Sequence, residues 1–87
     1  MSTHINGIVQ VTRKMNAVDA SHRDVSETEA AEFTRLSAER MELILTALRD
    51  GVDADLIQWA IGVNNSPAKI QIQHAIGHLA AAAALEG

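Results

Sequence analysis

The chain has 87 residues, 47% of them apolar, and its eleven acidic residues against seven Lys and Arg residues give a net charge of −4. A chain of this length forms one small domain that buries only about 60% of its unfolded surface. The lack of cysteine excludes a disulfide framework, a thiolate metal site and a cysteine nucleophile, and the acidic balance disfavours nonspecific attraction to nucleic acid or anionic membranes.

The apolar residues indicate helices. Phe33 and Trp59 are the only aromatic residues, and Ala, Ile and Leu supply most of the remaining apolar side chains. Close-packed helices suit this composition better than a β-sandwich does. No secretory leader is visible in the first twenty residues, and no stretch reaches the ~18 apolar residues of a membrane span. We therefore expect an all-α cytoplasmic protein without a membrane segment.

Residues 3–18 form the first predicted element, with side chains suited to burial at helical spacing: Ile5, Ile8, Val9, Thr12 and Met15. The run IVQVT within this stretch is rich in β-branched residues, so a short strand is the alternative. A lone strand would have no partner in an otherwise helical chain unless it paired with the same strand of another copy. A helix is therefore the preferred interpretation.

The capping signals and apolar spacing of residues 26–50 predict one long central helix. Ser26 and Glu29 match a capping box at its start, and Gly51 supplies a residue that can turn left-handed and end it. At about 100° per residue, its apolar side chains spread over roughly 200° of the circumference, about twice the stripe that one partner helix covers. We expect this helix to pack on two sides, and a second copy of the chain is a candidate for one of them.

Arg40 breaks the pattern of this helix, because its direction falls inside the apolar arc. One interpretation is that its aliphatic stem covers the core while its guanidinium reaches water. The other is that Arg40 contacts a ligand or another subunit and pairs there with a carboxylate. Both interpretations remain open at the level of the sequence.

A short helix is expected over residues 53–62, with Asp53 as its N-cap. Apolar side chains point in most directions around it, so little of its surface is expected to be free of contact. Trp59 is interpreted as a core residue. Because an indole N–H needs an acceptor, Trp59 is also of the type that contacts a partner protein.

The last helix is expected over residues 66–86, with Ser66 as its cap and Pro67 at its first position, where a missing N–H costs nothing. One apolar stripe would face the rest of the chain. A second stripe follows the far side: Ile70, His74, Gly77, Ala81 and Leu85. Gly77 and Ala81 make it small in the middle, so we interpret it as a packing seam for another helix, by analogy with small-residue packing in membranes.

The sequence contains few groups for metal binding or catalysis. His74 and His78 are four residues apart on one helix, the spacing at which two imidazoles can hold one metal ion. A third ligand would have to come from His4, His22 or a distant carboxylate, so the pair is interpreted as structural or interface residues. There is no Gly-rich phosphate loop and no serine with an evident base. We expect no metal, no cofactor and no enzymatic activity.

Residues 62–67, GVNNSP, join two predicted helices in the manner of a helix-turn-helix. Lys69, Gln71 and Gln73 would then be the residues near bases and phosphates. The preceding helix carries two aspartates where it would cross the phosphate backbone, which disfavours nucleic acid as a partner. A small DNA-binding regulator is therefore an alternative to the leading prediction.

The leading prediction is an all-α bundle of three or four helices in a single domain, built on the central helix and completed by homo-oligomerisation. Such a protein would self-associate and bind a partner protein to modulate or inhibit it. Its size and charge are compatible with those of phage- or mobile-element-encoded antagonists of host systems, by analogy with a broad class. A further alternative is an oligomer that holds a small anionic ligand between subunits through Arg13, Lys14 or Arg40. The candidate interface residues are Phe33, Arg40, Met41, Trp59, Ile70, His74, Gly77, His78 and Ala81.

Overall fold

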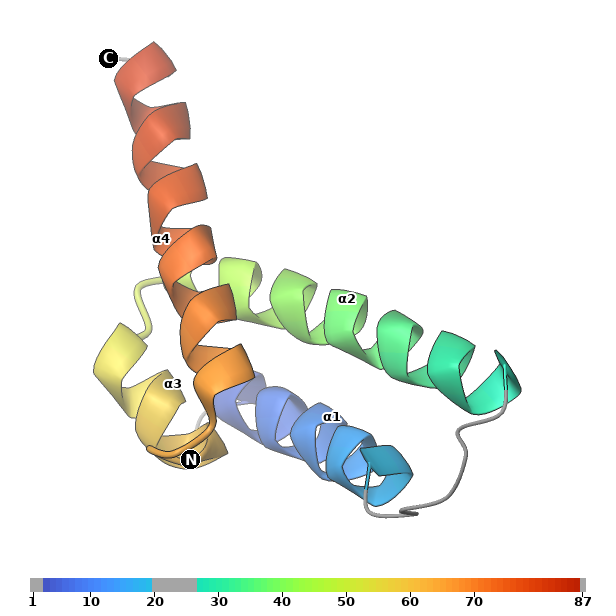
Figure 1. Cartoon of the computed structure of the whole chain (residues 1–87). Coiled ribbons are helices and arrows are strands. Elements are labelled where there is room, and N and C mark those ends of the chain that lie inside the picture. The colour runs from blue at the N-terminus through green and yellow to red at the C-terminus, as the bar shows by residue number, and fades with distance from the viewer. Residues whose placement is uncertain (1–2, 20–26, 87) are drawn as a thin grey trace.

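Four helices make up the part of the chain that the structure describes (Figure 1). The structure is a computed structural model that describes residues 3–19 and 27–86. The helices are α1 (Thr3–Asp19), α2 (Glu27–Arg49), α3 (Ala54–Ile61) and α4 (Ser66–Glu86). No strand occurs in these residues, so the all-α prediction is confirmed, and the strand alternative for residues 3–18 is wrong.

The main hydrophobic core joins all four helices. Its buried members are Ile5, Ile8, Ile44, Ala47, Ile57, Ile72 and Ala75. A second, smaller cluster lies between α1 and α2 and consists of Val11, Met15 and Leu36. The α1 positions at helical spacing thus face α2, which explains why a segment rich in β-branched residues is helical: burial of one face outweighs their weak helix propensity.

The helix α2 packs on two sides, as the width of its apolar arc predicts. It contacts α1 on one side and α4 on the other, and Figure 1 shows α1 and α2 lying side by side with α4 crossing α2. Both partners belong to the same chain, so α2 does not need a second copy to cover it. The large apolar side chains that remain exposed lie mostly on α3 and α4, with Phe33 of α2 exposed by 37%.

Part of this exposed surface is on α4, whose first half packs against α2 and α3 and whose second half extends away from the other helices (Figure 1). Its buried residues are Ala68, Ile72 and Ala75, all in the first half. The Cα radius of gyration is 13.9 Å, whereas a compact domain of this length would have about 12 Å. Over the described ranges, no helix has an apolar stretch long enough to cross a membrane.

The end of α2 follows the sequence prediction. Gly51 has φ 92°, in the left-handed region that glycine adopts without strain. Its N–H donates to the Leu48 carbonyl at 3.1 Å, and the Val52 N–H donates to the Ala47 carbonyl at 2.9 Å. These two bonds form a Schellman motif, and the contact of Val52 with the core around Ala47 completes it.

The start of α4 differs by one residue from its prediction. Asn65 is the N-cap in place of Ser66, because its Oδ1 accepts from the Ala68 N–H at 3.1 Å and its carbonyl accepts from the Lys69 N–H at 3.1 Å. Asn and Ser cap helices equally well, so local preference does not choose between neighbours. Pro67 then occupies the second helical position, where an N–H would also lack a helical acceptor.

The two remaining predicted caps lie at the starts of α3 and α2. Asp53 caps α3 as predicted, with its carboxylate accepting from the Asp55 N–H at 2.8 Å. The capping box predicted for α2 depends on Ser26, which lies outside the described residues. Local signals therefore define the end of α2 and the starts of α3 and α4.

Gly51→Ala is expected to lower the free energy of unfolding by about 1 kcal/mol, because an L-residue resists a positive φ. A Cβ at Gly51 would meet no atom within 4 Å, so the loss comes from the backbone alone. Gly77→Ala is the matched control: it lies in exposed helix with equally free space and should gain about 1 kcal/mol. Urea denaturation measures both, and equal effects of the two variants would contradict the left-handed cap.

Candidate functional site

Arg40 is the most unusual side chain of the molecule, because it is charged and only 2% exposed. Its Nε donates to Gln71 Oε1 at 2.6 Å, and its Nη1 lies 3.5 Å from Thr12 Oγ1. The interpretation in which the guanidinium reaches water is therefore wrong. None of the ion pairs among the described residues includes Arg40, and a carboxylate partner from another molecule stays a prediction.

The residues around Arg40 tie three helices together. Gln71 of α4 also donates its Nε2 to the backbone carbonyl and the hydroxyl of Ser37 on α2, each at 3.0 Å. Thr12 of α1 donates its hydroxyl to the Ile8 carbonyl at 2.8 Å. Burial lowers the pKa of Arg40 because desolvation disfavours the charged form. A guanidinium nevertheless keeps its proton in proteins, so the cluster holds one positive charge among neutral groups.

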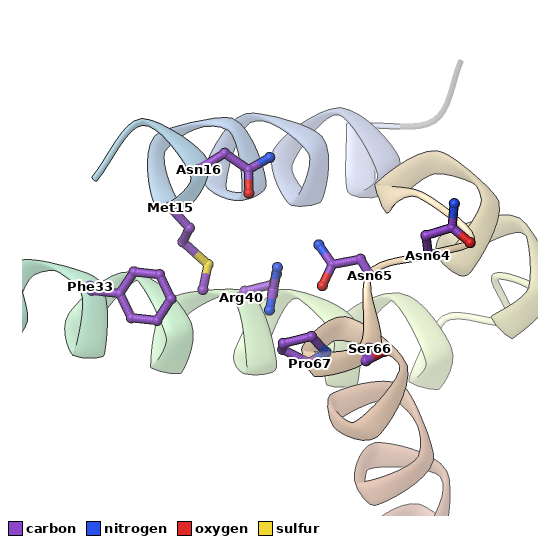
Figure 2. Close-up of a pocket in the computed structure, with 8 residues that line it drawn as sticks. All are labelled: Met15, Asn16, Phe33, Arg40, Asn64, Asn65, Ser66 and Pro67. Carbon is purple, nitrogen blue, oxygen red and sulfur yellow. The ribbon is translucent and has the colours of Figure 1, made fainter. Parts of the chain in front are cut away.

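A cavity of about 430 Å³ opens beside this cluster (Figure 2). It lies between the end of α1, the middle of α2 and the turn from α3 to α4. Its apolar wall consists of Met15, Phe33 and Pro67, and its polar wall consists of Asn16, Arg40, Asn64, Asn65 and Ser66. In Figure 2 the Arg40 guanidinium lies between the Met15 and Asn65 side chains. The cavity thus combines one buried cation, several amides and an apolar surface.

The asparagines of this cavity were not among the predicted site residues. Asn64 and Asn65 carry an ordinary turn signal, and Asn16 lies on an exposed part of α1. No sequence pattern links Asn16 with the turn residues Asn64 and Asn65. They reach one cavity only through the packing of α1 against α2 and α3. Of the predicted candidates, Phe33 and Arg40 do line this cavity.

Trp59 lies on a different surface, and its interpretation as a core residue is wrong. It is 72% exposed, and Ile57 is the residue of α3 that is buried. Of the other apolar residues of α3, Ala54, Ala60 and Ile61 are partly buried against the main core, whereas Leu56 and Trp59 are exposed. Trp59 borders a groove of about 430 Å³ between α1 and α3, whose lining residues are Ile5, Asn6, Val9, Gln10, Arg13, Leu56, Trp59 and Ala60. This groove is a second candidate contact surface.

The second stripe of α4 is a third surface. Its predicted residues are all exposed: Ile70, His74, Gly77, Ala81 and Leu85. The neighbouring candidate His78 is exposed as well. A Cβ at Gly77 would meet nothing within 4 Å, so no described helix covers the middle of the stripe. Met41 does not join this surface, since it is half-buried and packs against the main core. The candidate interface residues therefore fall on several surfaces instead of one.

The structure also places the groups considered for metal and nucleic acid. His4, which was considered as a third metal ligand, instead pairs through its Nε2 with Asp50 Oδ2 at 2.9 Å. Within the described ranges, no group of three His, Asp or Glu side chains is arranged to hold a metal ion. His22 lies outside those ranges. Gln71, one of the residues considered for DNA contacts, is occupied by Arg40 and Ser37.

Comparison with known proteins does not assign the chain to a family. No protein-family model matches the chain, and no curated protein or solved structure shows significant similarity to it. Its function must therefore be inferred from the three surfaces themselves: the cavity beside Arg40, the α1–α3 groove and the exposed side of α4.

Proposed function

We propose that the chain is a small interaction protein that self-associates through α4 and binds a partner protein whose activity it modulates. The observation that carries this proposal is the exposed apolar surface of α4. Apolar side chains occur all around α4 between a few polar ones, and such side chains are normally buried, yet here Ile70, Ile76 and Leu85 are 56%, 46% and 90% exposed. Such a surface in water favours pairing with another apolar surface.

The exposed area of the chain supports the same proposal. It amounts to 6018 Å², whereas a compact monomer of this mass would expose about 5000 Å². This excess of about 1000 Å² belongs to the chain as a whole, with exposed side chains of α3 such as Trp59 included; pairing of α4 would cover part of it, since each partner buries ~800 Å² in a stable interface of standard size. A second copy of α4 would supply a surface of matching length and chemistry.

The groove between α1 and α3 supports the part of the proposal that concerns a partner protein. Trp and Arg are the residue types that contribute most to binding energy at interfaces, and both Trp59 and Arg13 border this groove. None of its lining residues comes from α4. Occupation of the groove by a partner and pairing of α4 with a second copy would therefore use different residues.

The self-association is tested by placing a charge in the middle of the exposed stripe. Ala81→Glu is expected to raise the dissociation constant of the oligomer at least about tenfold, since about 1.4 kcal/mol suffices for a tenfold change and a carboxylate against apolar surface loses its hydration. Ala38→Glu, on an exposed side of α2, is the matched control and should leave association unchanged. Sedimentation equilibrium over a range of concentrations measures both.

The wild-type chain gives the stronger test. A dissociation constant weaker than about 1 mM, which corresponds to roughly −4 kcal/mol, would leave the protein monomeric under ordinary conditions. That result would exclude self-association as the role of α4, whatever the variants do.

A further inference from the structure

The charge of Arg40 has no counter-charge among the described residues. Its two acceptors, Gln71 and Thr12, are neutral, and it is 2% exposed. Buried charges in proteins are paired or bound to ions, because transfer from water is costly. Arginine cannot escape this cost by losing its proton. An anion that reached the guanidinium would therefore relieve an electrostatic imbalance that the fold leaves in place.

The guanidinium still has donors to offer such an anion. It carries five N–H groups, and its hydrogen bonds to described residues use only Nε and Nη1. The Nη1 and Nη2 edge of arginine matches a carboxylate with two parallel bonds. The first turn of α4 also borders the cavity through Ser66 and Pro67, and the positive end of a helix dipole favours an anion there.

The rest of the cavity determines which kind of anion fits. Met15, Phe33 and Pro67 form an apolar wall, and the Asn16 amide lies on the polar side. Only one fixed positive charge is present, in a chain whose net charge is −4. A polyanion would find too few cations, whereas one carboxylate with an apolar body would use both walls.

We propose that the cavity beside Arg40 binds an organic monocarboxylate, with the carboxylate at the guanidinium and the apolar body against Met15, Phe33 and Pro67. The carboxylate belongs either to a free small acid or to the carboxyl terminus of a polypeptide. This proposal does not rest on self-association, because the part of α4 beyond Pro67 contributes no residue to the cavity. The two proposals can therefore fail separately.

Calorimetric titration of the full chain at pH 7 with benzoate tests the site. Benzoate is expected to bind with a dissociation constant of about 1 mM or below. Benzyl alcohol, a neutral molecule of similar shape, should bind at least about tenfold more weakly, because it lacks the charge-assisted bonds. Arg40→Met should weaken benzoate binding by at least about tenfold, whereas Arg35→Met should not change it. Arg35 is a matched control, since it is exposed and pairs with Glu32 and Glu39.

A second variant covers the case in which Arg40→Met does not fold. Asn16→Asp adds a carboxylate to the wall of the cavity at an exposed position of α1. It should weaken benzoate binding about three- to tenfold through like-charge repulsion, and the loss should shrink at high salt. Circular dichroism establishes that each variant is folded.

The source of the carboxylate is distinguished by N-acetylphenylalanine, which resembles a polypeptide carboxyl terminus. Tighter binding of this compound than of benzoate assigns the cavity to a carboxyl-terminal residue, and tighter binding of benzoate assigns it to a free acid. The proposal is overturned if benzyl alcohol binds as well as benzoate, if folded Arg40→Met retains full affinity, or if the wild-type chain binds neither carboxylate at about 20 mM, well above the expected dissociation constant.

Discussion

Gln71→Leu is expected to lower the free energy of unfolding by about 3 kcal/mol, because a buried charge that loses a good acceptor is left nearly uncompensated. The variant removes the 2.6 Å bond from Arg40 and both bonds to Ser37. Arg40 would keep only the long 3.5 Å contact with Thr12. For a domain of this size the loss corresponds to a fall in melting temperature of about 10–20 °C, measured by thermal denaturation.

Two further variants show whether the loss comes from the buried charge. Gln73→Leu lies two residues further along α4 at an exposed position, and its effect should stay within about 0.5 kcal/mol. The double variant Arg40→Met with Gln71→Leu should recover most of the lost stability, since an apolar pair leaves no buried charge. If the double variant is less stable than Gln71→Leu alone, the stability loss has another origin.

Ile44→Ala is expected to lower the free energy of unfolding by about 3–4 kcal/mol. Ile44 is 0% exposed and belongs to the core cluster to which all four helices contribute. Truncation would leave a cavity in the core, and the four helices around it are packed too closely to move in and fill it. Urea denaturation at low protein concentration measures the effect without a contribution from association.

Two control variants distinguish the loss of core packing at Ile44 from a simple loss of hydrophobicity. Ile44→Val should lose only about 1 kcal/mol, because it removes one methyl group. Ile76→Ala makes the same truncation at a half-exposed position of α4 and should lose less than about 1 kcal/mol. Equal losses for Ile44→Ala and Ile76→Ala would show that the cluster around Ile44 is not the main core.

The helices were predictable because their signals are local. Gly51 and Asp53 act within one turn of their own positions, so the sequence alone locates the end of α2 and the start of α3. The width of the apolar arc on α2 also predicts two partners correctly. The width of the arc does not indicate whether the two partner helices belong to the same chain. For this reason a second copy was a candidate partner of α2.

The candidate site was less predictable because its contacts join distant parts of the chain. The direction of Arg40 follows from helical spacing, but its acceptor Gln71 is separated from it by 31 positions and depends on how α4 crosses α2. Trp59 shows a different limit. A short helix with apolar residues on every side has no preferred direction, so its sequence does not indicate that Ile57 faces the core and Trp59 faces water.

The hydrogen bonds of Gln71 have a consequence for how α4 is oriented about its own axis. The apolar side chains of this helix are spread around it and do not gather in one stripe, so the hydrophobic pattern alone selects its rotation only weakly. Only one rotation lets a single amide meet both Arg40 and Ser37. We infer that this amide selects the angle at which α4 docks, and so decides which flank of the helix is presented outward.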